Sequence, residues 1–162
     1  MGLTVTFWIL ALVAVLAAMA VVFLKNIFRA ALALILCFLT VAGIYITLSA
    51  DFLAAVQVLV YVGAISVLII LAIMMTRDVQ RGSPSNNLKI PVFFAAVLVV
   101  GVMIYTIIST NWQIATADPL TPTTAALAGK LFGENGFVLP VEIGAVLLLA
   151  AILGAIIIAR EK

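Results

Sequence analysis

The chain has 162 residues, of which 67% are hydrophobic and 9% are charged, with a formal net charge of +2. Soluble domains are about 45–50% apolar and about 25% charged, and a soluble globule of this length could not bury so much apolar surface. The composition therefore excludes an ordinary soluble domain, gives no indication of nucleic-acid binding, and predicts a single integral membrane domain over 1–162.

Five apolar segments are long enough to cross a bilayer, because a spanning helix needs about 20 apolar residues. In chain order the predicted helices cover 3–24, 27–49, 52–75, 91–109 and 137–159. No basic region precedes the first segment, so we expect it to be retained rather than cleaved. The fold class is therefore an all-α membrane protein with five transmembrane helices.

The basic residues predict the orientation of these helices. Seven of the eight fall on one side of a five-helix bundle: Lys25, Arg29, Arg77, Arg81, Lys89, Arg160 and Lys162. Only Lys130 falls on the other side. Because cytoplasmic loops are enriched in Lys and Arg, we expect the N-terminus outside and the C-terminus in the cytoplasm.

The longest connection, 110–136, is predicted to lie outside. Apolar residues recur at near-helical spacing after Pro122, with Thr123 or Thr124 as the candidate N-cap. This pattern predicts a short amphipathic helix on the membrane surface, with an ordered coil as the alternative.

The third segment carries polar and small residues where a lipid-facing helix needs none. Gln57 and Tyr61 are four residues apart and share one helical face, which Ala54 and Ala64 extend. Such a stripe favours contact with protein, through hydrogen bonds and close approach. Gly63 costs about 1 kcal/mol relative to alanine within a helix. It serves either close packing or a local π-bulge, a feature frequent at functional sites.

Two carboxylates lie near helix ends. Glu142 is placed about 8 Å inside the fifth segment, at 1.5 Å per residue. It either reaches the headgroup zone or is a buried carboxyl able to exchange protons. Pro140 suits a first helical turn. Asp51 begins the third helix, where capping and the helix dipole explain it without a function.

The remaining features favour a subunit rather than a self-contained enzyme. The chain has one cysteine, Cys37, within an apolar run, and no histidine, so neither an internal disulfide nor a Cys/His metal site is expected. Pairs of small residues at helical spacing predict tight helix packing. These pairs are Ala14 with Ala18, Ala150 with Gly154, and Ala151 with Ala155.

Two stretches resemble a known family. The run "FLAAVQVLVYVGAISVLIILAIMM", with its Tyr61-x-Gly63-Ala64-Ile65 core, resembles the third helix of subunit J of bacterial NADH-quinone oxidoreductase, respiratory complex I. The mitochondrial counterpart is NADH dehydrogenase subunit 6. The closing run "GKLFGENGFVLPVEIGAVLLLAAILGAIIIAREK" is similar to the end of the same family.

The resemblance implies a multi-pass subunit of the bacterial inner membrane, without catalytic activity of its own. It implies partners similar to subunits A, H and K and the antiporter-like subunit N, besides lipid. It implies no cofactor on this chain, with NADH, FMN, iron–sulfur clusters and quinone bound by other subunits. It also implies a third helix that can carry a π-bulge and gates a proton path. The resemblance assigns gating to Tyr61 and Gly63, with Glu142 as a polar partner. The hypothesis for the proton path also includes Gln57 and Ala64 from the same helix.

One position departs from the family. Some relatives carry a carboxylate where this chain has Gln57, and a glutamine orders water but does not ionise. Three alternatives stay open from the sequence. The chain could belong to a ferredoxin-dependent relative of complex I, to a membrane-bound hydrogenase or multisubunit cation/proton antiporter, or to a structural membrane scaffold.

Overall fold

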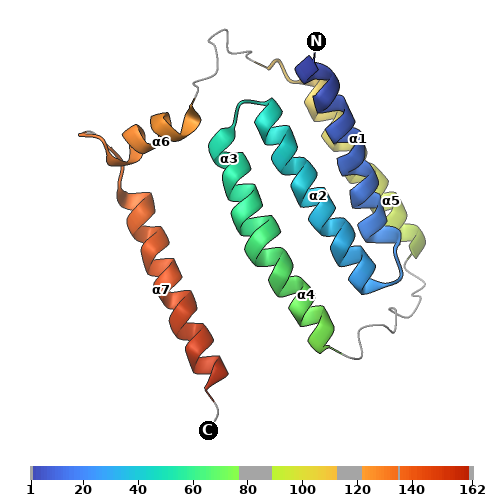
Figure 1. Cartoon of the computed structure of the whole chain (residues 1–162). Coiled ribbons are helices and arrows are strands. Elements are labelled where there is room, and N and C mark those ends of the chain that lie inside the picture. The colour runs from blue at the N-terminus through green and yellow to red at the C-terminus, as the bar shows by residue number, and fades with distance from the viewer. Residues whose placement is uncertain (1, 77–88, 113–121, 135, 161–162) are drawn as a thin grey trace.

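The computed structural model describes residues 2–76, 89–112, 122–134 and 136–160, and the regular structure in them is entirely helical (Figure 1). A single helix over 51–75 contains three parts, of which the middle one, η1, is a π-helix. The elements in chain order are α1 (Gly2–Phe23), α2 (Ile27–Thr47), α3 (Asp51–Val56), η1 (Gln57–Ile65), α4 (Ser66–Met75), α5 (Lys89–Ser109), α6 (Thr123–Phe132) and α7 (Leu139–Ala159).

Five of these helices are long and apolar enough to span a membrane: α1, α2, the 51–75 helix, α5 and α7. This confirms the all-α membrane fold and the five predicted segments. The N-terminus and α6 lie at one end of the helices, and the C-terminus lies at the other (Figure 1). The direction in which the chain crosses the membrane stays a prediction, and Arg77, Arg81 and Lys162 fall outside the described residues.

Three helices form one packed layer, with α2 between α1 and the 51–75 helix (Figure 1). Small residues allow this contact: Ala17, Ala31 and Ala42 are buried. A Cβ added to Gly43 would lie 3.0 Å from a methyl carbon of Leu10, so the glycine lets α1 and α2 approach closely. Of the predicted small pair on α1, Ala14 is half-buried and Ala18 is exposed, whereas the buried residue is Ala17.

The turn after α2 sets where the third helix begins. Ser49 has a left-handed backbone, with φ of 57°. The N–H groups of Ser49 and Ala50 donate to the carbonyls of Ile46 and Tyr45, at 3.1 and 2.9 Å. This is the Schellman pattern that closes a helix. It ends α2 at Thr47, two residues before the predicted end, and lets a new helix start at Asp51.

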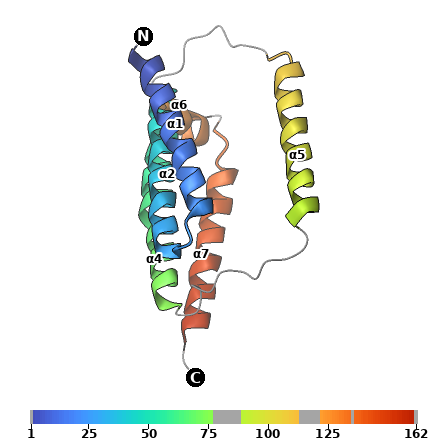
Figure 2. The ribbon, with the colours of Figure 1, turned by 90° about the vertical axis from the view of Figure 1, so that its right-hand side faces the viewer.

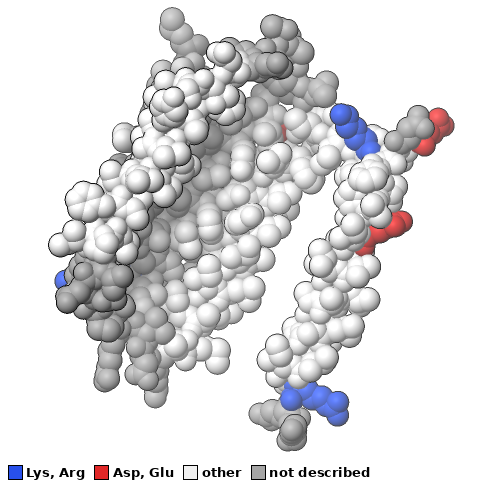
Figure 3. Space-filling model, turned by 180° about the vertical axis from the view of Figure 1, so that it is seen from behind, with Lys and Arg blue, Asp and Glu red and all other residues white. Residues whose placement is uncertain are grey.

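The helices α5 and α7 stand apart from this layer (Figures 1 and 2). None of the residues in their spanning windows is buried. Seen from behind, charged side chains lie toward the helix ends and the flanks between them are uncharged (Figure 3). The small-residue pairs of α7 therefore have no packing partner within the described part of this chain.

The predicted amphipathic helix is present as α6, which runs across the direction of the spanning helices (Figure 1). Its predicted cap is wrong. Pro122 occupies the N-cap position, without a capping side chain, and Thr123 is the first helical residue. The Thr123 hydroxyl is engaged elsewhere, as an acceptor for the backbone N–H of Phe52 at 3.3 Å.

Candidate functional site

The candidate site is the π-helix η1 in the middle of the third spanning helix. It comprises nine residues, Gln57–Ile65, and includes Tyr61, Gly63 and Ala64. The resemblance predicted a π-bulge near the glycine, and the structure contains π geometry there over a longer stretch. Extended π-helices are rare, and their occurrence often marks a functional position.

The effect of η1 is visible in which side chains are buried. Gln57 is 8% exposed and Ser66 is 2% exposed, although nine residues separate them. In a regular α-helix nine residues make about two and a half turns, which puts the two side chains on opposite faces. The wider π turns bring both onto the buried face.

Ser66 holds the end of the π-helix. Its backbone N–H donates to the carbonyl of Tyr61, five residues earlier. Its hydroxyl donates to the same carbonyl at 2.7 Å. An α-helical bond would instead join Ser66 to the residue four earlier. The serine side chain therefore adds a second hydrogen bond to the Tyr61 carbonyl, which the backbone N–H of Ser66 reaches only in the π register.

The start of η1 is held against α2. The Gln57 side-chain amide donates to the carbonyl of Phe38 in a long hydrogen bond of 3.5 Å. The Tyr61 ring meets the Phe38 ring edge to face, with centroids 5.4 Å apart and planes at 68°. Phe38 thus contacts two of the predicted site residues, which the structure brings together.

A groove runs beside this contact, with a volume of about 210 Å³ and a mostly apolar lining. Its lining combines apolar side chains with three that carry hydrogen-bonding groups, and consists of Tyr45, Phe52, Leu53, Val56, Gln57 and Tyr61. A space of this size with several polar groups can hold ordered water. The groove therefore has the size and the hydrogen-bonding groups to hold a few water molecules beside the first half of η1.

Gly63 lies in open space. A Cβ added there would meet only the carbonyl oxygen of Val58, at 3.4 Å, which is an ordinary contact. No atom of another described helix lies within 4 Å of that position. Packing within the described part of the chain therefore does not explain this glycine, unlike Gly43.

Two predicted positions differ from the structure. Ala64 was expected to extend the face of Gln57 and Tyr61, but it is exposed, because the π turns move the buried face to Ser66. Glu142 was expected deeper inside the fifth helix. That helix begins at Leu139, so Glu142 lies in its first turn, and Pro140 opens the helix as predicted.

Glu142 is also separate from η1. Its side chain is exposed, and α7 stands away from the 51–75 helix (Figure 1). Tyr61, at 41% exposure, lies at the edge of the buried face. The described chain thus joins Gln57 and Tyr61 into one site and leaves Glu142 outside it.

Two contributors were not predicted from the sequence, Ser66 and Tyr45. Ser66 gave a signal, because it is a hydroxyl within a run of 24 residues without charge. Tyr45 gave none, since its place in the groove depends on how α2 packs. Among the described residues no group of three His, Cys, Asp or Glu side chains could hold a metal. The arrangement can order water and change shape.

Comparison with known proteins identifies the family of the chain. Residues 17–158 match the family described as NADH-ubiquinone/plastoquinone oxidoreductase chain 6. The chain is 40% identical to the F(420)H(2) dehydrogenase subunit J of Methanosarcina mazei, over 98% of this chain and 92% of that protein. It is 42% identical to the NAD(P)H-quinone oxidoreductase chain 6 of a Synechocystis species, over 97% and 80%. It is 39% identical to a chloroplastic NAD(P)H-quinone oxidoreductase subunit 6 of Nephroselmis olivacea, over 89% and 85%.

Proposed function

Because this chain belongs to the NADH-ubiquinone/plastoquinone oxidoreductase chain 6 family and is a membrane subunit of a complex-I-type oxidoreductase, we propose that η1 gates the proton path of that complex. The relatives are dehydrogenase and quinone-oxidoreductase subunits. The antiporter, hydrogenase, ferredoxin-dependent and scaffold alternatives are therefore not favoured.

The observation that carries the proposal is the joint burial of Gln57 and Ser66. Return of η1 to α geometry would turn one of these side chains about half a turn away from α2. The same change would move the Tyr61 ring relative to Phe38, at the edge of the groove beside η1. The change of helix register thus changes which polar side chains line the groove beside η1 and how much water the groove holds.

Gly63 supplies the freedom for that change. During conversion each backbone N–H in η1 must pass from the carbonyl five residues earlier to the one four earlier. A residue without a side chain lets the neighbouring carbonyls shift unhindered. In this proposal Tyr61 is the moving gate, Gly63 its pivot, and Gln57 orders water without ionising.

The remaining assignments belong to the same proposal. The chain binds no redox cofactor and is not a catalyst alone; NADH or another electron donor, FMN, iron–sulfur clusters and quinone are bound by other subunits. The unpacked flanks of α5 and α7 support contacts with subunits resembling A, H, K and N. Ala64 borders the gate, and Glu142 serves the path only together with residues of such partners. The complex lies in the bacterial plasma membrane.

A substitution at Gly63 tests the gate. Gly63→Ala adds a methyl group that the π geometry accommodates, whereas Gly63→Val adds β-branched bulk with restricted side-chain rotamers beside the carbonyls that must shift. We expect Gly63→Val to lower quinone-coupled turnover and proton pumping together, and Gly63→Ala to lower them much less.

Both activities are normalised to the amount of assembled complex in native membranes. Electron transfer to a water-soluble acceptor, measured alongside, should stay within about twofold of wild type, since a gate lies outside that reaction. Normal coupled turnover for each assembled Gly63→Val complex would refute the gate.

A further inference from the structure

Two helix N-termini far apart in the chain cap each other. The N-cap positions of α3 and α6 are Ala50 and Pro122, and neither makes a capping hydrogen bond through its side chain. The first N–H groups of each helix need acceptors, because they have none within the helix. Each helix finds its acceptor on the other one.

The exchange has two hydrogen bonds. The Asp51 carboxylate accepts the backbone N–H of Thr123 at 3.1 Å. The Thr123 hydroxyl accepts the backbone N–H of Phe52 at 3.3 Å. We name Asp51, Phe52 and Thr123 the reciprocal cap. The single carboxylate lies beside the N-termini of two helices, where an acidic side chain is stabilising.

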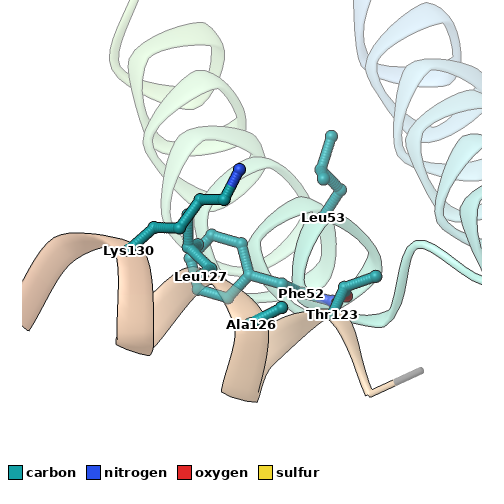
Figure 4. Close-up of a pocket in the computed structure, with 6 residues that line it drawn as sticks. All are labelled: Phe52, Leu53, Thr123, Ala126, Leu127 and Lys130. Atoms are coloured by element: carbon teal, nitrogen blue, oxygen red, sulfur yellow. The ribbon is translucent and has the colours of Figure 1, made fainter. Parts of the chain in front are cut away.

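An apolar groove continues from the reciprocal cap along the two helices. A groove of about 260 Å³ separates Phe52 and Leu53 on α3 from Ala126 and Leu127 on α6, with Lys130 at its edge (Figure 4). Phe52 also lines the groove beside η1, together with Gln57 and Tyr61. Phe52 therefore lies between α6 and the residues of the proposed gate.

Resting on the proposed gate, the geometry points to Asp51 and Thr123 as positioning residues that hold the α3 end of the third helix still. A π-to-α conversion must turn one end of that helix relative to the other, by roughly 100° for each residue of register. The α3 end packs against both α2 and α6, whereas among the described helices α4 packs mainly against α2. The rotation therefore occurs in α4. The reciprocal cap determines which half of the helix rotates.

Hydrogen–deuterium exchange of the assembled complex in detergent or nanodiscs tests the reciprocal cap directly. Thr123→Val removes the hydroxyl that Phe52 uses and keeps the shape of the side chain. A hydrogen bond of this kind shifts an opening equilibrium by about two- to tenfold. We expect exchange in a peptide covering 50–55 to accelerate by that factor. Asp51→Ala should in turn accelerate exchange in a peptide covering 122–127.

Matched variants distinguish positioning from folding. Thr124→Val changes the adjacent, exposed threonine and should leave exchange at Phe52 unchanged. Thr123→Ser and Asp51→Asn keep an oxygen acceptor and should restore most of the protection. Coupled turnover for each assembled complex should fall about two- to tenfold in Thr123→Val and recover in Thr123→Ser.

Unchanged exchange at Phe52 in Thr123→Val would overturn the reciprocal cap, whatever the activity. Accelerated exchange with normal turnover for each complex would overturn the positioning role. Both outcomes are separate from failure of the gate, which Gly63→Val reports. If Gly63→Val is normal while exchange responds as expected, the cap stands and the gate falls.

Discussion

Ser66 links the local chemistry of one side chain to the geometry of a whole helix. A serine hydroxyl within a helix usually bonds a carbonyl three or four residues earlier, as Thr106 does in α5 with the carbonyls of Met103 and Val102. Ser66 bonds the carbonyl five residues earlier. The side chain thus stabilises the π register that brings it onto the buried face.

Ser66→Ala should weaken that register. Loss of one hydrogen bond of this type costs about 0.5–1.5 kcal/mol, and the alanine leaves no large cavity. We expect coupled turnover for each assembled complex to change by about two- to tenfold. Thr106→Val is the control, because it removes a similar hydroxyl from a regular α-helix. Equal turnover in wild type and Ser66→Ala would show that the hydroxyl has no part in the register.

The helices contain two kinds of glycine. Gly43 lies at the contact between α1 and α2, where an added Cβ would come within 3.0 Å of Leu10. Gly63 lies on η1, where an added Cβ meets only its own helix. The first glycine permits packing and the second permits a change of backbone conformation.

The two single variants Gly43→Val and Gly63→Val should therefore give opposite results. Gly43→Val forces α1 and α2 apart at a cost of about 1–3 kcal/mol. We expect less assembled complex in the membrane and normal turnover for each complex that forms. The measurement is complex abundance by native electrophoresis together with coupled activity. Low activity for each assembled Gly43→Val complex would mean that the α1–α2 contact also takes part in turnover.

Element type and number were predictable, because a lipid environment demands long apolar helices and the breaks between them carry polar residues. The burial of Gln57 was indicated by its helical spacing from Tyr61. The exposure of Ala64 and the burial of Ser66 were not. Helical periodicity assumes 3.6 residues per turn, and a π-helix changes the phase of every residue that follows it.

The reciprocal cap was beyond local rules for a different reason. Capping rules search for an acceptor on the same helix, so they assigned Thr123 or Thr124 to α6 and Asp51 to α3. In the structure Asp51 caps α6, and Thr123 serves α3. Residues about 70 positions apart make these bonds, and only the arrangement of the helices brings them together.

At the scale of the whole molecule, the described chain is a packed three-helix layer with two further spanning helices that stand apart from it (Figures 1 and 2). The flanks of α5 and α7 are apolar and unburied within the described residues. Helices in lipid associate through packing and hydrogen bonds, so partner subunits are the expected neighbours. The proposed gate thus works inside an assembly.

The orientation of that assembly is open to direct labelling. Seven basic residues at one end predict a cytoplasmic location for it. In a Cys37→Ser background, Glu134→Cys should react with an impermeant maleimide from outside intact cells or spheroplasts. Lys25→Cys should react only in inverted vesicles. Labelling of Lys25→Cys from outside would reverse the predicted orientation.

The central claim is that the third helix adopts two registers, with η1 as the element that changes. The most direct measurement is cryo-electron microscopy of the assembled complex, at rest and during turnover, at a resolution that separates π from α hydrogen bonding. The account predicts two populations. Gln57 faces α2 in both, whereas Ser66 faces α2 in the π population and is turned about half a turn away in the α population. A single π register in every population during turnover would contradict the account.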